Sequence, residues 1–172
     1  PLFDEAESAG ADGILTAIAH IGTDFIVQWS DQERPLGMAG VTVPAEDPTY
    51  WSNTEGKCAF VTGSLVGGVD GAYVTEKGAE LAQKWNDADA YGGSPMYPGF
   101  HTYDGIKMFA KAAEEAGTVE TSELVPILEG MSHDGTAGTV EFYGEDHDYP
   151  HDVKRGDDLV HEMQYQWQPE GD

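Results

Sequence analysis

The stretch that most constrains the fold is ADGILTAIAHIGTDFIVQW, residues 11–29. Its apolar run at 14–18 lies between two glycines and predicts a buried strand, and apolar residues at helical spacing then predict a helix over 23–32. The loop between them leaves the carboxyl end of the strand, which is the edge where open α/β sheets bind their ligands. His20 is the first polar side chain of that loop, so we expect it to face a ligand crevice.

A second strand is expected at 36–39, which completes a strand, helix, strand unit and therefore predicts a parallel sheet. Residues 40–56 carry two prolines and many turn formers and are expected to be irregular. The remaining pattern predicts helices at 2–9, 74–91, 99–116 and 121–129, and strands at 57–62, 139–143 and 159–167. This order favours a three-layer α/β fold with an irregular tail.

Caps and apolar faces give more detailed expectations for the helices. Thr75 is the expected N-cap of helix 74–91, and a Ser/Thr cap is expected to begin helix 121–129. Gly117 is expected to end helix 99–116. The apolar stripe of that helix is expected to consist of Tyr103, Ile106, Phe109, Ala110 and Ala113.

The charge balance decides which partners and surroundings suit the chain. Asp and Glu total 32 against 8 Lys and Arg, for a formal net charge of -24, which makes nucleic acid an unsuitable partner. The carboxylates are spread along the chain and 40% of the residues are hydrophobic, so we expect a folded protein rather than a disordered acidic tail. Molar salt screens such repulsion. The composition therefore predicts adaptation to high salt.

Cysteine usage and hydropathy say little about the compartment. Cys58 is the single cysteine, lies in the apolar run CAFV and is expected to be buried and inert. No apolar stretch approaches the roughly 20 residues needed to span a bilayer, and no signal peptide is recognisable. The first residues already read as a helix, so we expect the sequence to be part of a longer precursor.

The loop at 145–152, EDHDYPHD, has the composition of a divalent-metal site, with His147 and His151 among four acids. Pro150 argues against a helix there, so the two histidines need not share a face. In so acidic a chain, a solvated loop between two strands is the expected structure, and no metal is predicted.

The start of helix 99–116 brings together His101, Tyr103 and Asp104, where helix N–H groups favour an anionic or polar ligand group. For Asp104 a structural role is favoured. Tyr97, in the loop before, suits equally a ligand cover and a packing residue. The chain lacks a G-x-S-x-G elbow, a phosphate loop and a Cys/His pair in a recognisable setting, so no enzyme and no cofactor are predicted.

The ordered set of these segments resembles one family, the type I solute-binding proteins of ABC importers that take branched-chain amino acids, amides or urea. The matching segments are AGADGILTAIAHIGTDFIVQWSDQ, PLGMAGVT, YPGFHTYDGIKMFAKAAEEAG, GTAGTVEFYGEDHDYPHD and the closing YQWQPEG. The resemblance implies a Rossmann-like αβα fold of the periplasmic-binding-protein type I class. It covers only the C-terminal half of such proteins, so the fold is expected to be incomplete relative to the two-lobed family.

The resemblance also implies lobe assignments and ligand contacts. Residues 1–97 correspond to the second, ligand-binding lobe, 98–138 to the segment returning to the first lobe, and 139–172 to the late crossover. The implied ligand-binding residues are Ala19, His20, Gly40, Thr42 and Tyr97. The glutamate that amino acid binders place near residues 40–42 is absent, and an unpaired buried ammonium is costly. An amide, a urea-like compound or an aromatic acid is therefore at least as well suited as leucine.

The functional expectation is a non-enzymatic, extracellular protein that captures a small molecule and delivers it to an ABC transporter permease. Membrane association is expected only through a lipid anchor or leader outside this sequence. A sensory module of the same fold is the alternative. A metal-dependent enzyme built on His147 and His151 is less favoured.

Overall fold

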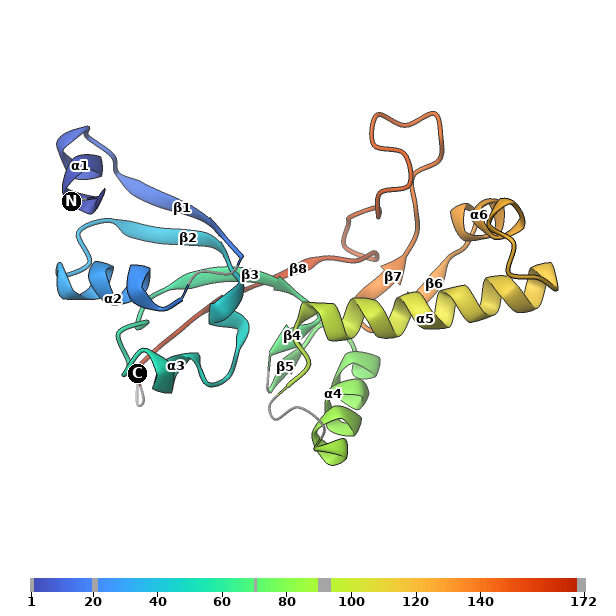
Figure 1. Cartoon of the computed structure of the whole chain (residues 1–172), viewed down its shortest axis with the longest axis horizontal. Coiled ribbons are helices and arrows are strands. Elements are labelled where there is room, and N and C mark those ends of the chain that lie inside the picture. The colour runs from blue at the N-terminus through green and yellow to red at the C-terminus, as the bar shows by residue number, and fades with distance from the viewer. Residues whose placement is uncertain (1, 20–21, 70, 90–93, 170–172) are drawn as a thin grey trace. The chain divides into compact units, whose positions relative to one another are not determined.

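The computed structural model describes residues 2–19, 22–69, 71–89 and 94–169 (Figure 1). The chain divides into two compact units, which we describe separately. Unit 1 comprises residues 1–65 and 164–172, and unit 2 comprises residues 66–163. Among the described residues, no helix combines the length and apolar character that a membrane-spanning helix requires.

Unit 1 is built on a parallel strand pair, and Figure 1 shows α2 running alongside it. Residue 13 pairs with 37 and residue 18 with 42, so the two strands end together at their carboxyl ends. A second pair joins β3 to β8. The elements are α1 (Leu2–Ser8), β1 (Gly13–Ile18), α2 (Asp24–Asp31), β2 (Gly37–Thr42), the 3-10 helix η1 (Val43–Glu46), α3 (Tyr50–Asn53), β3 (Thr62–Val66) and β8 (Glu162–Gln166).

The core of unit 1 shows how α2 packs against the β1–β2 pair. Ile26 and Trp29, on the inner face of α2, are 1% and 2% exposed and pack in one cluster with Met38 of β2. The Trp29 indole also donates a 2.8 Å hydrogen bond to the carbonyl of Leu36, at the start of the return strand. The apolar spacing in the sequence thus buries one helix face and fixes the turn behind it.

Unit 2 consists mainly of helices with two short hairpins (Figure 1). Its core lies between α5, α6 and the second hairpin and contains Met108, Leu124 and Val140. Gly117, at φ 68°, ends α5 as expected. The elements are β4 (Gly68–Val69), β5 (Ala72–Tyr73), α4 (Glu76–Ala88), α5 (Tyr97–Ala116), α6 (Thr121–Glu129), β6 (His133–Gly135) and β7 (Gly138–Val140).

The predicted α/β class and parallel pairing are confirmed, and so is the Thr75 cap, whose hydroxyl accepts a hydrogen bond from the N–H of Gly78. Along the chain, the boundaries between the compact units fall between residues 65 and 66 and between residues 163 and 164. The lobe assignments 1–97, 98–138 and 139–172 concern correspondence with the family rather than compactness, and they stay predictions.

Four local predictions are wrong. The strand expected at 14–18 forms as β1 but is not buried, since Leu15 is 87% exposed and Thr16 is the one buried residue of the strand. Residues 57–60 form turns rather than a strand. The side chains of Cys58 and of the following Val61 are fully buried, so the apolar run indicates burial without fixing strand geometry. Residues 40–42 belong to β2, so the irregular segment begins later. The N-cap of α6 is Glu120, whose side chain makes no cap hydrogen bond.

The predicted apolar stripe of α5 is also wrong. Ile106 is 63% exposed and Phe109 is 49% exposed. The buried face instead carries residues four apart along the helix: Phe100, Asp104, Met108 and Ala112. Because Asp104 is polar, a prediction based on hydrophobicity alone does not identify this row as the buried face.

Candidate functional site

The carboxyl edge of the β1–β2 pair is the candidate ligand-binding surface in unit 1. Ile18 and Thr42 are register partners at the ends of the two strands. Ala19, which follows Ile18, is exposed, so the loop leaving β1 begins at the surface. The structure therefore brings Ala19 and Thr42 to one edge, whereas Gly40 pairs with Thr16 two residues before it. His20, the leading predicted contact, lies outside the described residues.

Gly40 occupies its position because no larger residue fits. Its φ is 127°, and a Cβ at this position would lie 2.3 Å from the carbonyl oxygen of Thr16. Thr16 is the register partner of Gly40 on β1. The glycine that the sequence offered as a ligand contact thus also has a structural role, because it allows the two strands to approach closely.

Thr42 is 2% exposed, and its hydroxyl is used within the strand pair. It donates to the hydroxyl of Thr16 at 3.1 Å, and Thr16 in turn donates to the carbonyl of Ala39 at 3.2 Å. This chain of hydrogen bonds satisfies two buried hydroxyl groups. Thr42 is therefore a buried residue of the strand pair, whereas Ala19 is exposed.

Tyr97, in unit 2, is the first residue of α5 and is partly buried. Its ring meets the ring of His101 edge-on, with the centroids 6.0 Å apart. Partial burial lowers the pKa of His101, and the nearby Arg155 guanidinium lowers it further, against an opposite effect from Asp104. The imidazole therefore favours its neutral form at the beginning of α5.

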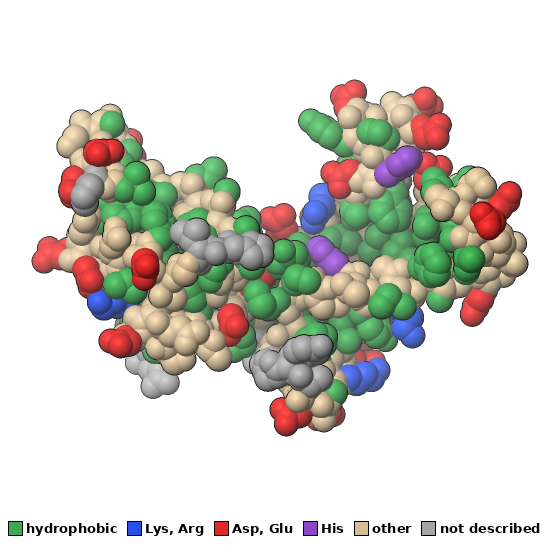
Figure 2. Space-filling model, viewed as in Figure 1, with side chains coloured by type: hydrophobic (Ala, Val, Ile, Leu, Met, Phe, Trp, Pro, Cys, Tyr) green, Lys and Arg blue, Asp and Glu red, His purple; other side chains and the backbone are tan. Residues whose placement is uncertain are grey.

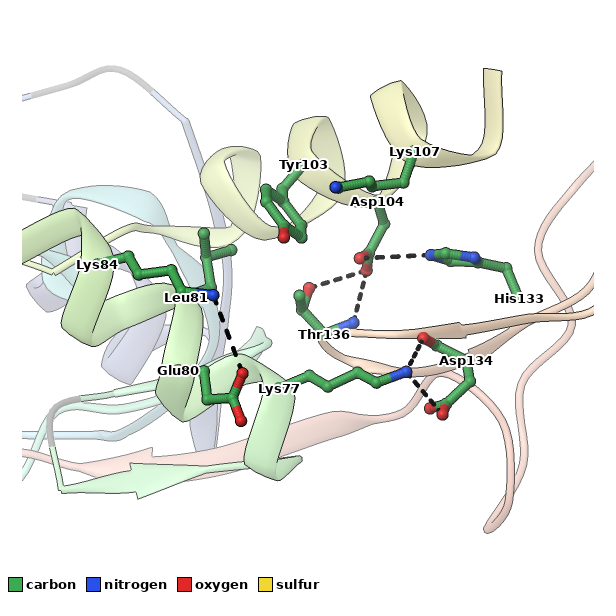
Figure 3. Close-up of a pocket in the computed structure, with 10 residues that line it drawn as sticks. All are labelled: Lys77, Glu80, Leu81, Lys84, Tyr103, Asp104, Lys107, His133, Asp134 and Thr136. Atoms are coloured by element: carbon green, nitrogen blue, oxygen red, sulfur yellow. Dashed lines mark hydrogen bonds and ion pairs between the residues drawn. The ribbon is translucent and has the colours of Figure 1, made fainter. Parts of the chain in front are cut away.

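A pocket of about 250 Å³ in unit 2 lies between α4, α5 and β6 (Figure 3). Its floor is the buried carboxylate of Asp104, whose Oδ2 accepts hydrogen bonds from the N–H and the hydroxyl of Thr136, both at 2.8 Å. His133 Nε2 lies 3.7 Å from the other oxygen, Oδ1. Asp104 thus has the structural role that the sequence favoured, although it lies deeper in the helix than a first-turn acid.

The cations around this pocket already face carboxylates or an aromatic ring. Figure 3 shows Lys77 reaching Asp134, at 2.7 Å, and Lys84 directed toward Glu80. Lys107 lies over the ring of Tyr103, 5.4 Å from its centroid. With Asp104 on the floor, the ionised groups of the described lining are close to balance, so the pocket has no marked preference for a charged ligand.

Thr136 and His133 were missed from the sequence. Both lie about thirty residues from Asp104 in the chain, since the Thr136 contact spans 32 positions, and nothing local announces such a partner. The segment HDGTAG around them has short strands with two glycines. That composition signals a turn but not the residue that the turn contacts.

The two histidines of loop 145–152 have different surroundings. The His147 ring stacks on Tyr143, with centroids 3.7 Å apart, and its Nδ1 accepts the N–H of Tyr149. His151 instead places Nε2 2.5 Å from Oε1 of Glu129, the last residue of α6. The loop is made of turns, as expected, and the histidines do not act as a pair.

No protein-family model matches the chain, and neither does any curated protein compared with it. Solved structures do match. A solute-binding protein of an ABC transporter from Rhodopseudomonas palustris BisB5, in complex with 3,4-dihydroxybenzoic acid, has a TM-score of 0.69 at 14% identity; the match covers 96% of this chain and 47% of that one. The type 1 periplasmic binding protein from Bordetella pertussis Tohama I gives the same TM-score at 15% identity, covering 96% and 46%.

A third match is the leucine-, isoleucine-, valine-, threonine- and alanine-binding protein from Brucella ovis, with a TM-score of 0.66 at 17% identity, covering 86% of this chain and 37% of that one. The chain has the fold of type I periplasmic binding proteins. It spans less than half the length of these three structures. The resemblance drawn from the sequence is thereby confirmed for the fold.

Proposed function

We propose that the chain belongs to a non-enzymatic solute-binding protein that captures a small organic molecule outside the cell and delivers it to an ABC transporter permease. The observation that carries this proposal is the parallel β1–β2 pair, whose carboxyl ends coincide within a type I fold. Open α/β sheets bind ligands at that edge. The similar proteins from R. palustris, B. pertussis and B. ovis are named as binding proteins, which supports the same role.

Within this proposal, the ligand contacts are Ala19, His20, Gly40, Thr42 and Tyr97. Ala19 is exposed after the end of β1. The hydroxyl groups of Thr42 and Thr16 already donate hydrogen bonds within the strand pair. The edge therefore offers few free polar groups in the described residues, and it lacks a carboxylate at 40–42 to pair with an ammonium. An amide, a urea-like compound or an aromatic acid therefore suits such an edge at least as well as leucine does.

Isothermal titration calorimetry with four probes tests the ligand class: leucine, acetamide, urea and benzoate, each titrated into the full-length protein in molar KCl. We expect saturable one-to-one binding of acetamide, urea or benzoate, with leucine binding no more tightly. Tight binding of leucine alone would overturn the ligand class. Absence of binding by every probe at millimolar concentration would contradict the proposed function.

A further inference from the structure

Three ligand groups converge where α6 meets the loop that follows β7. Glu129, Glu145 and His151 each offer one ligand atom, and these atoms lie within 4.8 Å of one another. Zinc bonds of roughly 2.0–2.2 Å bring the ligand atoms of one ion to within about 4 Å of each other. Only small side-chain movements separate this arrangement from the geometry of a bound ion.

Glu129 supplies the observation that distinguishes this place from an ordinary acidic loop. Its Oε1 is buried and accepts no hydrogen bond from the described residues. His151 Nε2 is its ion-pair partner at 2.5 Å. A cation bound by both atoms would take a lone pair from each in place of that pair.

The backbone holds His151 in place. Its N–H donates to the carbonyl of Tyr143 at 2.9 Å, and the N–H of Tyr143 donates to the carbonyl of Asp152 at 2.9 Å. These bonds close the base of the loop, and Phe142 and Val153 continue the pairing beneath it. His151 sits at φ 65°, a conformation that the closed loop imposes. The backbone of His151 is therefore fixed within the loop.

The surrounding charge and the mixed donor set select the kind of ion. Asp146, Asp148 and Asp152 belong to the same loop, and Figure 2 shows acidic side chains over it. The adjacent cation Lys154 is held by Glu141 at 3.2 Å. One imidazole nitrogen with carboxylate oxygens is typical of Zn²⁺ and related transition metals, whereas Ca²⁺ and Mg²⁺ prefer oxygen alone.

We propose that Glu129, Glu145 and His151 form a binding site for a divalent transition-metal ion such as Zn²⁺, which ties the loop to the end of α6. The site is separate from the proposed solute site and independent of it. His147 does not belong to this convergent group of ligand atoms, and its ring stacks on Tyr143 instead.

Calorimetric titration of Zn²⁺ into the untagged, metal-stripped full-length protein in molar KCl tests the proposal, because salt suppresses diffuse attraction to the acidic surface. We expect one ion per chain at this site and a loss of affinity of at least about tenfold in His151→Ala and Glu129→Gln. His147→Ala is the matched control from the same loop and is expected to bind like the native chain.

Glu145→Gln provides a second variant at an exposed position, and circular dichroism of every variant verifies that it is folded. Equal loss of affinity in His147→Ala and His151→Ala would overturn the ligand assignment. Zn²⁺ binding that none of the three ligand variants weakens, or that an equal concentration of Ca²⁺ abolishes, would show diffuse adsorption and overturn the site.

Discussion

At the scale of single residues, most positions singled out in the sequence turn out to have a structural role that can be measured. Gly40 lets β1 and β2 approach, the Thr42 hydroxyl donates to that of Thr16, and Asp104 accepts two hydrogen bonds from Thr136. Such roles do not exclude ligand contact. They do determine which substitutions report on stability and which report on binding.

Gly40→Ala is expected to destabilise the protein by at least about 2 kcal/mol, because the new Cβ would meet the carbonyl oxygen of Thr16 and the φ of 127° is unsuited to alanine. Gly37→Ala is the matched control in the same strand, where the added Cβ meets nothing within 4 Å. Urea unfolding measures both free energies. Equal stability of the two variants would contradict the close approach at residue 40.

Asp104→Ala is expected to lower the free energy of unfolding by about 2–4 kcal/mol, because it leaves the buried N–H of Thr136 without its acceptor and the hydroxyl with only the long 3.5 Å contact to the carbonyl of Phe100. Glu114→Ala, at an exposed position of the same helix, is the control and is expected to change it by less than about 0.5 kcal/mol. Unfolding of both variants at the same urea concentration would show that the Asp104 hydrogen bonds to Thr136 do not stabilise the protein.

At the scale of elements, the sequence predicted best where one face of an element is apolar and its partner is close in the chain. The β1–α2–β2 unit follows from apolar runs, glycines and a short connection. The start of α4 follows from the Thr75 cap and the end of α5 from Gly117, whereas the predicted cap of α6 is wrong. The burial of α5 was not predictable, because its buried row includes Asp104, whose partner Thr136 is distant in sequence.

The β6–β7 hairpin escaped prediction for a related reason. Its strands have three residues each and contain glycines, so they show too little alternation to be recognised. The segment at 57–60 shows the opposite error, since buried apolar residues there form turns. In the candidate site, residues on one local unit could be grouped from the sequence, whereas contacts between distant segments could not.

The start of α4 offers a test at this scale. The hydroxyl of Thr75 accepts from the N–H of Gly78 at 2.9 Å and donates to the carbonyl of Thr136 at 2.7 Å, which joins the helix to the hairpin. Thr75→Ala is expected to cost about 1–2 kcal/mol, and Thr75→Ser is expected to recover most of it. Thermal or urea unfolding of the pair distinguishes the cap from the threonine methyl group; equal losses in both variants would exclude the cap.

At the scale of the whole molecule, the net charge of -24 is the dominant property. Acidic side chains are spread over the visible face of both units (Figure 2), so their repulsion acts on each unit separately. Adaptation to high salt stays a prediction from composition. It concerns stability in solution rather than the fold, which is shared with the proteins from R. palustris, B. pertussis and B. ovis.

Lowering the salt concentration tests that prediction. The Debye length grows from roughly 3 Å at 1 M salt to about 10 Å at 0.1 M, so the carboxylates repel one another over longer distances. Circular dichroism is expected to show progressive loss of helix as KCl falls from molar to 0.1 M. A spectrum and melting temperature that do not change over this range would contradict the prediction.

The central claim is that a solute binds at the carboxyl edge of the parallel strands. Its most direct test is calorimetry of the full-length protein with the tightest-binding probe, comparing His20→Ala with the native chain and with Tyr149→Ala, an exposed control. We predict that affinity falls at least about tenfold in His20→Ala and is unchanged in the control. Native affinity in His20→Ala would contradict the account.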